Sequence, residues 1–262
     1  MNNREEQLAA FNRLLDVMET LREKCPWDRK QTFDSLRCNT IEETFELTDA
    51  IFNHDMANIK KELGDVLLHI VFYSKMAQEQ DQFDIADVCN SLCNKLIFRH
   101  PHVYGEVHAD TPEAVKQNWE QLKRQEKDGN RTVLSGVPRS LPSIIKAYRI
   151  QDKARNVGFD WEERTQVWNK VKEEIGEFST EIERMDADSM EDELGDVLFS
   201  IINAARLYGI NPDNALERTN QKFIRRFTYL EEKTLKQGRD LRNMSLSEMD
   251  AIWNEAKALE KE

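Results

Sequence analysis

The chain has 262 residues, of which 39% are hydrophobic and 33% charged, and its formal net charge is −12. This length allows one large domain or two ordinary ones, and nine glycines with six prolines leave few turns, which favours long amphipathic helices. The negative charge argues against general nucleic-acid binding, which needs a basic surface, but it allows a phosphate-bearing small molecule to bind through a metal cation.

The N-terminal residues MNNREEQLAAF contain no apolar stretch preceded by basic residues, so no signal peptide is expected. The longest apolar runs, such as residues 66–73, are far too short to span a bilayer. These features predict a soluble, cytoplasmic protein with no membrane partner.

The first half of the chain contains two acidic motifs separated by fifteen residues, EETFE at 42–46 and ELGDVL at 62–67. Trp27 and Asp28 precede them, and Lys95, Arg99 and Trp119 follow. The residues NHD at 53–55 are interpreted as a turn between two helices. The candidate carboxylates of this half are Glu42, Glu43, Glu46, Glu62 and Asp65.

A turn-rich segment, KDGNRTVLSGVPRSLP at 127–142, separates the two halves. It predicts an N-terminal domain over 1–127 and a C-terminal domain over 139–262. A helix is expected to begin directly after this segment, with Ser140 as its N-cap and Pro142 in its first turn.

The second half repeats the first in order and spacing. EEIGE at 173–177 and ELGDVL at 193–198 are again fifteen residues apart. Phe159 and Asp160 precede them, Lys222 and Arg226 follow, and Trp253 corresponds to Trp119. The chain is therefore predicted to contain two homologous domains.

Apolar residues recur in each acidic segment at the spacing of one helix face. On the first helix of the second half they are Val167, Val171, Ile175, Phe178 and Ile182, and on the next Leu194, Val197, Leu198, Ile201, Ile202 and Ala205. A turn at 185–189 is expected between them, with Asp188 or Ser189 as N-cap. Trp161 and Trp168 are expected in the core. The predicted fold is all-α, with tandem duplicated helical domains.

The acidic residues of these two helices are expected to converge at the edge of the core. The predicted group consists of Glu173, Glu174, Glu177, Glu193 and Asp196. Without compensation such a cluster is costly, and ligands that are all oxygen atoms favour Mg²⁺ or Mn²⁺. Acidic runs are more often solvated helix faces, but solvation gives no reason to repeat both motifs and their gap.

Gly64 and Gly195 lie in the middle of the predicted helices at a cost of about 1 kcal/mol each relative to alanine. Both stand beside an acidic residue, and we expect them to allow close approach of a neighbouring helix.

The second half contains no histidine and no cysteine. If this half is catalytic, histidine bases and cysteine nucleophiles are therefore excluded there. A water activated by a metal, with a carboxylate as the base, remains as the nucleophile, and this chemistry suits hydrolysis of phosphoanhydrides. The chain has no GxxxxGK[ST] loop, so phosphates would be neutralised by metal and by Lys222, Arg225, Arg226 and Lys257. Trp253 is a candidate for stacking on a nucleobase, and core packing is an equal alternative.

The duplicated EExxE and ExxD motifs occur together with CPWDRKQT, RHPHVYGE, GVPRSLP, VGFDW and KFIRRF. In this combination the chain resembles the MazG family of the all-α nucleoside triphosphate pyrophosphohydrolase superfamily, over nearly its whole length. The resemblance implies a homodimer of four-helix-bundle-like units completed by dimerisation. It also implies Mg²⁺-dependent release of pyrophosphate from many nucleoside triphosphates, in the removal of aberrant or surplus nucleotides.

In two-domain members of that family the second domain is the one that looks catalytic. The resemblance therefore implies that the five carboxylates of the second half hold the metal, that Lys222 and Arg226 contact phosphates and that Trp253 lies near the nucleotide. The first half keeps its own five carboxylates but has Phe45 and His69 where the second has Gly176 and Ser200. These bulkier groups are expected to narrow a pocket, which predicts a role in assembly or regulation.

Three other interpretations remain at this point. A di-iron carboxylate bundle would need Glu-x-x-His motifs, which neither acidic block contains. A non-enzymatic helical interaction module would present the acidic blocks to a basic partner. Within the superfamily, a narrow preference of the dUTPase type is the nearer alternative, because the sequence does not reveal base-selective hydrogen bonds.

Overall fold

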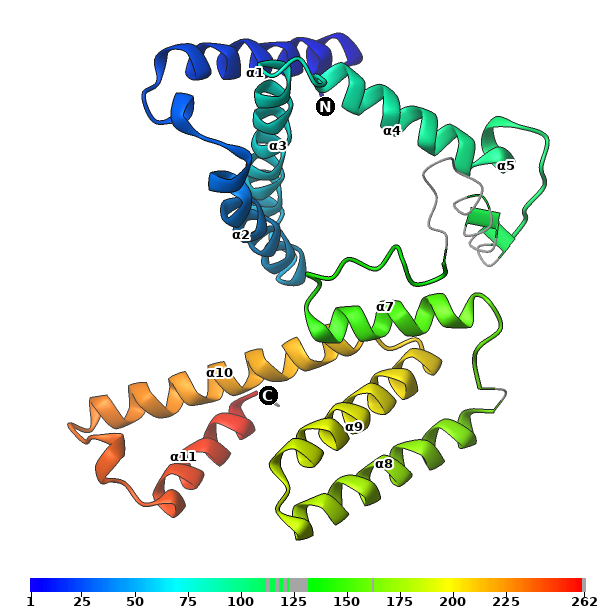
Figure 1. Cartoon of the computed structure of the whole chain (residues 1–262). Helices are drawn as coiled ribbons and strands as arrows, with labels where there is room; N and C mark the ends of the chain where they lie inside the picture. The colour runs from blue at the N-terminus through cyan, green and yellow to red at the C-terminus, as the bar shows by residue number, and fades with distance from the viewer. Residues whose placement is uncertain (112–113, 116–117, 120–121, 123–131, 162, 261–262) are drawn as a thin grey trace. The chain divides into compact units, whose positions relative to one another are not determined.

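The computed structural model describes residues 1–111, 114–115, 118–119, 122, 132–161 and 163–260 (Figure 1). The described residues form helices and no strand, which confirms the all-α class. The chain divides into two compact units, residues 1–119 and 120–262. The proposed end of the first domain at residue 127 lies outside the described residues, so that boundary stays a prediction. Among the described helices, none has the length and apolar character needed to cross a membrane.

The N-terminal unit begins with three long helices. They are α1 (Arg4–Lys24), α2 (Phe33–Phe52) and α3 (Met56–Gln78), with the short 3₁₀ helix η1 (Asp28–Lys30) between α1 and α2. α4 (Ile85–Arg99) and α5 (Pro101–Tyr104) follow. Asn3, Thr32 and Asp84 accept hydrogen bonds from the first turns of α1, α2 and α4 and complete capping boxes. As predicted, residues 53–55 form the turn between α2 and α3, and Asp55 caps α3.

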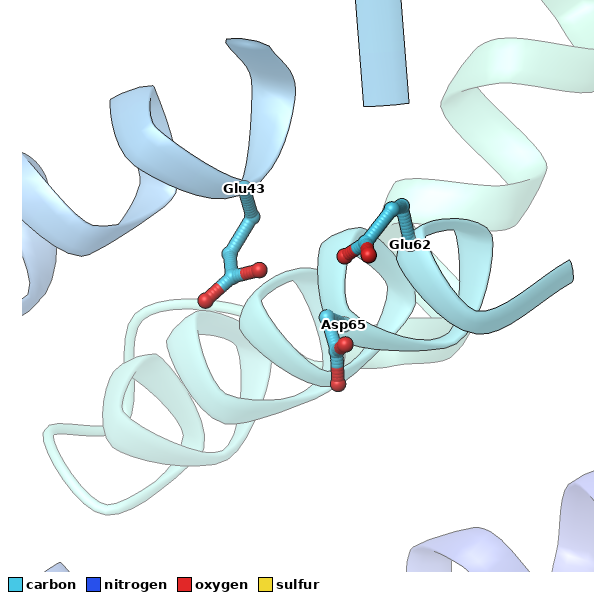
Figure 2. A group of neighbouring side chains, drawn as sticks. All are labelled: Glu43, Glu62 and Asp65. Atoms are coloured by element: carbon cyan, nitrogen blue, oxygen red, sulfur yellow. The ribbon is translucent and has the colours of Figure 1, made fainter. Parts of the chain in front are cut away.

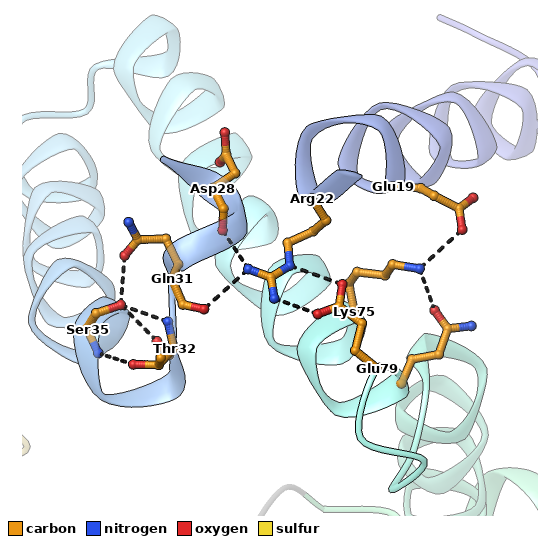
Figure 3. Close-up of polar contacts among 9 residues, drawn as sticks. Glu19, Arg22, Asp28, Gln31, Thr32, Ser35, Lys75 and Glu79 are labelled. Atoms are coloured by element: carbon orange, nitrogen blue, oxygen red, sulfur yellow. Dashed lines mark hydrogen bonds and ion pairs between the residues drawn. The ribbon is translucent and has the colours of Figure 1, made fainter. Parts of the chain in front are cut away.

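The core of the N-terminal unit lies where α1, α2 and α3 meet. Its buried members are Met18, Leu36, Val71, Phe72 and Met76. Beside it, Arg22 of α1 donates hydrogen bonds to the backbone oxygens of Asp28 and Gln31 and pairs with the Glu79 carboxylate at 2.5 Å (Figure 3). One guanidinium group therefore ties α1, the η1 segment and the end of α3 together.

The C-terminal unit is built from two helical pairs and one further helix (Figure 1). α8 (Arg164–Arg184) and α9 (Ala187–Leu207) lie side by side, as do α10 (Pro212–Lys236) and α11 (Leu246–Leu259). α7 (Ser143–Arg155) contacts α9 and α10, and the 3₁₀ helix η2 (Leu241–Asn243) precedes α11.

α7 begins directly after the turn-rich segment, as expected, but the predicted N-caps of α7 and α9 are wrong. α9 is capped by Asp186, which accepts from the backbone amides of Asp188 and Ser189, so the cap precedes both residues that were expected to provide it. α7 begins at Ser143 with Pro142 at its N-cap position, so Ser140 does not cap it. Pro142 therefore precedes the first turn, with backbone angles φ −51° and ψ 142° outside the helical region.

The apolar faces of α8 and α9 are only partly buried within one chain. Val167, Val171 and Ala204 form a small buried cluster. Five members of the predicted stripes remain exposed, namely Ile175, Ile182, Leu194, Leu198 and Ile201. The expectation that Trp161 and Trp168 are core residues is also wrong, because each is 44% exposed.

Candidate metal site and adjoining cavity

Helix spacing and the α8–α9 pairing bring three carboxylates of the C-terminal unit together. Glu174, Glu177 and Glu193 each place one oxygen within 4.8 Å of the others. Glu174 and Glu177 are three residues apart and share the face of α8 that meets α9. Glu173 is turned about 100° away from Glu174, and its exposed side chain lies outside this group. The expected convergence of all five carboxylates is thus reduced to three.

A lysine that the motif does not contain neutralises part of this cluster. The Lys170 ammonium lies 2.8 Å from Glu173 and 2.7 Å from the buried Glu174 carboxylate. These hydrogen bonds raise the pKa of Lys170 above its ordinary value, so it stays charged. A hydrogen bond with Glu174, followed by burial, raises the pKa of the Glu177 carboxyl. The Glu193 Oε2 atom is buried without a hydrogen-bond partner among the described residues.

A cavity of about 590 Å³ opens beside the acidic group. Its charged lining residues include Lys170, Glu174 and Asp196, the last of which is the fifth predicted carboxylate. Most of the remaining wall is apolar, including Ile150, Ala154, Phe159, Trp161, Val167 and Phe199. Its volume falls within the range of small-molecule sites.

A buried ion pair fixes another part of the cavity wall. The Arg206 guanidinium, with a side chain only 3% exposed, donates to both Asp160 oxygens at 3.1 and 2.5 Å and to Asn203 Oδ1 at 2.8 Å. All three residues line the cavity. This bidentate pair joins the segment before α8 to the last turn of α9 and holds the wall in one geometry.

The predicted basic and aromatic set lies on α10 and α11, away from the helix pair α8–α9 that carries the acidic group. Arg226 hydrogen-bonds to Glu260 at 2.9 and 2.6 Å, and its guanidinium lies 5.8 Å from the centre of the Trp253 ring. Trp253 also contacts Phe223, and Arg225 lies 3.6 Å from Glu260. Lys222 and Lys257 are exposed.

The N-terminal unit repeats the acidic group with a different lysine. Glu43, Glu62 and Asp65 turn toward one another between α2 and α3, with one oxygen from each within 4.8 Å (Figure 2). The Lys61 ammonium lies 2.8 Å from Glu62, 3.7 Å from Asp65 and 3.8 Å from Glu46. Glu42 is exposed and lies outside the group, as Glu173 does in the other unit.

Larger side chains occupy the N-terminal positions that correspond to part of the cavity wall. His69 and Phe72 stand where the C-terminal unit has Ser200 and Asn203, and both are buried. His69 Nδ1 lies 2.6 Å from the Thr40 hydroxyl, and burial lowers the His69 pKa, which favours the neutral imidazole. Phe45, by contrast, is 52% exposed, so the expectation that it narrows a pocket stays a prediction.

The expected role of Gly64 and Gly195 in close helix approach is not supported within the chain. A Cβ atom built on either residue meets no described atom within 4 Å, apart from the backbone of its own helix.

Sequence reasoning missed two features of the site, the Lys170 contacts and the Asp160–Arg206 pair. Lys170 stands four residues before Glu174 on the same helix face, a spacing that could have indicated an ion pair. Asp160 and Arg206 are 46 residues apart, and no local pattern connects them.

Comparison with known proteins places both acidic groups in the same kind of domain. The profile of the MazG nucleotide pyrophosphohydrolase domain matches residues 31–104 and again 163–230. A nucleoside triphosphate pyrophosphohydrolase of Escherichia coli K12 is 40% identical over 257 residues, covering 95% of this chain and 98% of the relative. In Thermotoga maritima, a nucleoside triphosphate pyrophosphohydrolase/pyrophosphatase MazG is 41% identical, with 94% and 95% covered. A Mycobacterium tuberculosis nucleoside triphosphate pyrophosphohydrolase is 34% identical over 56% of this chain and 46% of its own length.

Proposed function

The chain belongs to the MazG nucleotide pyrophosphohydrolase family, and from that premise we propose that its C-terminal unit hydrolyses nucleoside triphosphates to monophosphates and pyrophosphate. The reaction breaks the anhydride bond between the α- and β-phosphates and adds the oxygen of water to phosphorus. The observation that carries the proposal is the carboxylate group Glu174, Glu177 and Glu193, of which Glu174 lines a cavity of about 590 Å³.

The carboxylates of this group fit a hard divalent cation such as Mg²⁺, with Mn²⁺ as a substitute. All three donors are oxygens, and the unpartnered Glu193 Oε2 atom is a buried acceptor that a cation would satisfy. Asp196, which lines the same cavity as Glu174, would complete the ligand set. A bound cation would neutralise phosphate charge and lower the pKa of a coordinated water.

The chain's own residues supply orientation and shape. Lys170 holds Glu173 and Glu174 in place and provides a second positive charge for the phosphate end of a substrate. The Asp160–Arg206 pair fixes the wall, and the apolar lining excludes water from the part that would receive a nucleobase. A mainly apolar wall makes few base-specific hydrogen bonds, which supports broad base specificity.

The predicted nucleotide-binding set of Lys222, Arg225, Arg226, Trp253 and Lys257 is retained in this proposal as a group that contacts substrate from α10 and α11. Arg226 forms an ion pair with Glu260 in this structure. To contact a substrate phosphate, the Arg226 guanidinium must leave the Glu260 carboxylate and bind the phosphate in its place. Arg226 therefore contributes mainly to substrate affinity.

The remaining parts of the proposal concern the whole molecule. The N-terminal unit, with large side chains at the cavity positions, serves in assembly or regulation. Two copies form a homodimer in the cytoplasm, and the activity clears aberrant or surplus nucleotides from the pool. Support for the dimer comes from the exposed apolar residues of α8 and α9.

Product analysis with the full chain tests the catalytic assignment. ATP, dUTP and the other triphosphates are incubated with and without Mg²⁺, and products are separated by ion-exchange chromatography. Wild-type protein should form monophosphate and pyrophosphate from triphosphates of several different bases. It should do so only when Mg²⁺ is present. Glu177→Gln should lower the rate roughly 100-fold or more, because even indirect disturbance of metal ligands costs 10- to 100-fold.

The matched control is Glu183→Gln, which removes an exposed carboxylate from the same helix α8 and should leave the rate unchanged. If Glu177→Gln keeps full activity while Glu46→Gln loses it, catalysis belongs to the N-terminal unit. Turnover of dUTP alone would replace broad specificity with the narrow alternative, and no turnover of any nucleotide would refute the enzymatic proposal.

A further inference from the structure

One carboxylate, that of Glu260, is held by much of the basic set that was predicted to bind nucleotide. Glu260 directly follows α11, and its Oε2 atom accepts hydrogen bonds from Arg226 Nε at 2.9 Å and Nη2 at 2.6 Å. Its Oε1 atom lies 3.6 Å from Arg225 Nε. The hydrogen bonds from Arg226, together with the charges of Arg225 and Lys222, lower the pKa of the Glu260 carboxyl, which is therefore an anion at neutral pH.

The donors that hold Glu260 are the ones that a phosphate group would use. Arginine binds carboxylate and phosphate oxygens with the same N–H groups, so a phosphate cannot occupy the Arg226 donors while Glu260 does. A hollow of about 200 Å³ is lined by Arg225, Arg226 and Glu260, which leaves space for an anion beside both guanidinium groups. The Trp253 ring centre lies 5.8 Å from the Arg226 guanidinium carbon, so the ion pair forms next to the predicted nucleobase contact.

On the basis of the proposed function, we propose that Glu260 is an autoinhibitory residue, whose carboxylate takes the place of a substrate phosphate on Arg226 until a nucleotide displaces it. The pair is partly open to solvent, with the Arg226 side chain 19% and the Glu260 side chain 27% exposed, so the two groups can separate. Apparent affinity falls with the fraction of molecules in which the binding groups are free. Glu260 therefore raises the nucleotide concentration that half-saturates the enzyme, without taking part in cleavage of the anhydride bond.

A second carboxylate of α11 provides the matched control. Glu255 accepts a hydrogen bond from the Tyr229 hydroxyl at 2.7 Å and forms an ion pair with Lys233. It thus joins α11 to α10 as Glu260 does, but neither of its partners belongs to the predicted nucleotide-binding set. Glu255→Gln and Glu260→Gln remove the same charge from the same part of the chain and free different cations.

Binding of the non-hydrolysable analogue α,β-methylene-ATP to the full chain, measured by isothermal titration calorimetry with Mg²⁺, tests the proposal. Glu260→Gln should tighten binding by about two- to fivefold, the range expected when one ion pair between partly exposed side chains is removed. Glu255→Gln should leave the affinity unchanged. In the hydrolysis assay Glu260→Gln should lower KM by a similar factor with kcat unchanged, because the contact affects binding alone.

The expected change is a gain of affinity, which a misfolded variant does not produce. Unchanged or weaker binding by Glu260→Gln, in a protein whose wild type binds and hydrolyses nucleotide, would overturn the autoinhibitory role and leave the proposed function intact. An equal gain in Glu255→Gln would also overturn it, because the effect would then be one of overall negative charge. A wild-type protein that neither binds the analogue nor hydrolyses ATP would refute the proposed function and this inference together.

Discussion

The two acidic groups receive their lysines from opposite helices. In the N-terminal unit Lys61 of α3 contacts the carboxylates, and in the C-terminal unit Lys170 of α8 does so. The corresponding positions of the other unit are occupied by Asp192 and Asn39. Each unit therefore places one lysine ammonium beside its group of three carboxylates, but the helix that carries the lysine differs between the two units. Both halves share the pairing of one positive charge with the acidic group, and they do not share the position of the lysine.

The cap of α11 gives a pH-dependent prediction at the residue scale. Glu248 accepts hydrogen bonds from Arg239 and from the backbone and hydroxyl of Ser245, and these lower the pKa of its carboxyl from 4.5 to about 2. A carboxyl with a lowered folded-state pKa stabilises the fold above its unfolded value of 4.5. That contribution is lost as the pH falls toward 2.

Urea unfolding of wild type and Glu248→Gln between pH 7 and pH 3 checks this. The variant should be less stable by a constant amount above about pH 5, and the difference should shrink as the pH falls below 4.5. A difference that grows on acidification would show that the carboxylate does not stabilise the cap. Because α11 carries Trp253 and Lys257, its first turn also matters for the position of the predicted nucleotide contacts.

At the scale of elements, the repeat made the helices and their pairing predictable from the sequence. The fifteen-residue gap indicated an antiparallel pair in each half, and α2–α3 and α8–α9 are those pairs. Which glutamate of each EE pair joins the group was not predictable, because it depends on the rotation of α8 against α9. Nor could the sequence place Asp160 beside Arg206, since that contact arises only when α9 packs beside the segment before α8.

Gly64 in α3 and Gly195 in α9 have open space where a side chain would stand, so both helices should tolerate alanine at these positions. Since an added Cβ at Gly195 meets no described atom within 4 Å outside its own helix, Gly195→Ala should stabilise metal-free protein. The gain in helix propensity is roughly 0.5–1 kcal/mol, and Gly64→Ala should behave alike. Urea unfolding measures both. Destabilisation by Gly195→Ala would show instead that another subunit approaches this face closely.

At the scale of the whole molecule, the apolar patterns predicted more burial than one chain provides. Leu194, Leu198 and Ile201 were expected to face a core, yet each is more than 40% exposed. The buried cluster beside them contains only Val167, Val171 and Ala204. Apolar helix faces of this extent usually pack against a partner. The sequence pattern thus predicts the apolar face correctly, but the described contacts within one chain leave that face exposed.

We therefore expect two copies of the chain to associate through the exposed face of α8 and α9, as the family resemblance also implies. Leu198, at 53% exposure, lies on this face, and Leu198→Glu should convert dimer to monomer because a buried unpaired carboxylate is strongly unfavourable. Light scattering coupled to gel filtration at micromolar concentration measures the mass. Leu246→Glu, at a residue that is 72% exposed at the start of α11, is the matched control and should remain dimeric. A monomeric wild-type protein, or a Leu198→Glu variant that stays dimeric, would contradict association through the α8–α9 face.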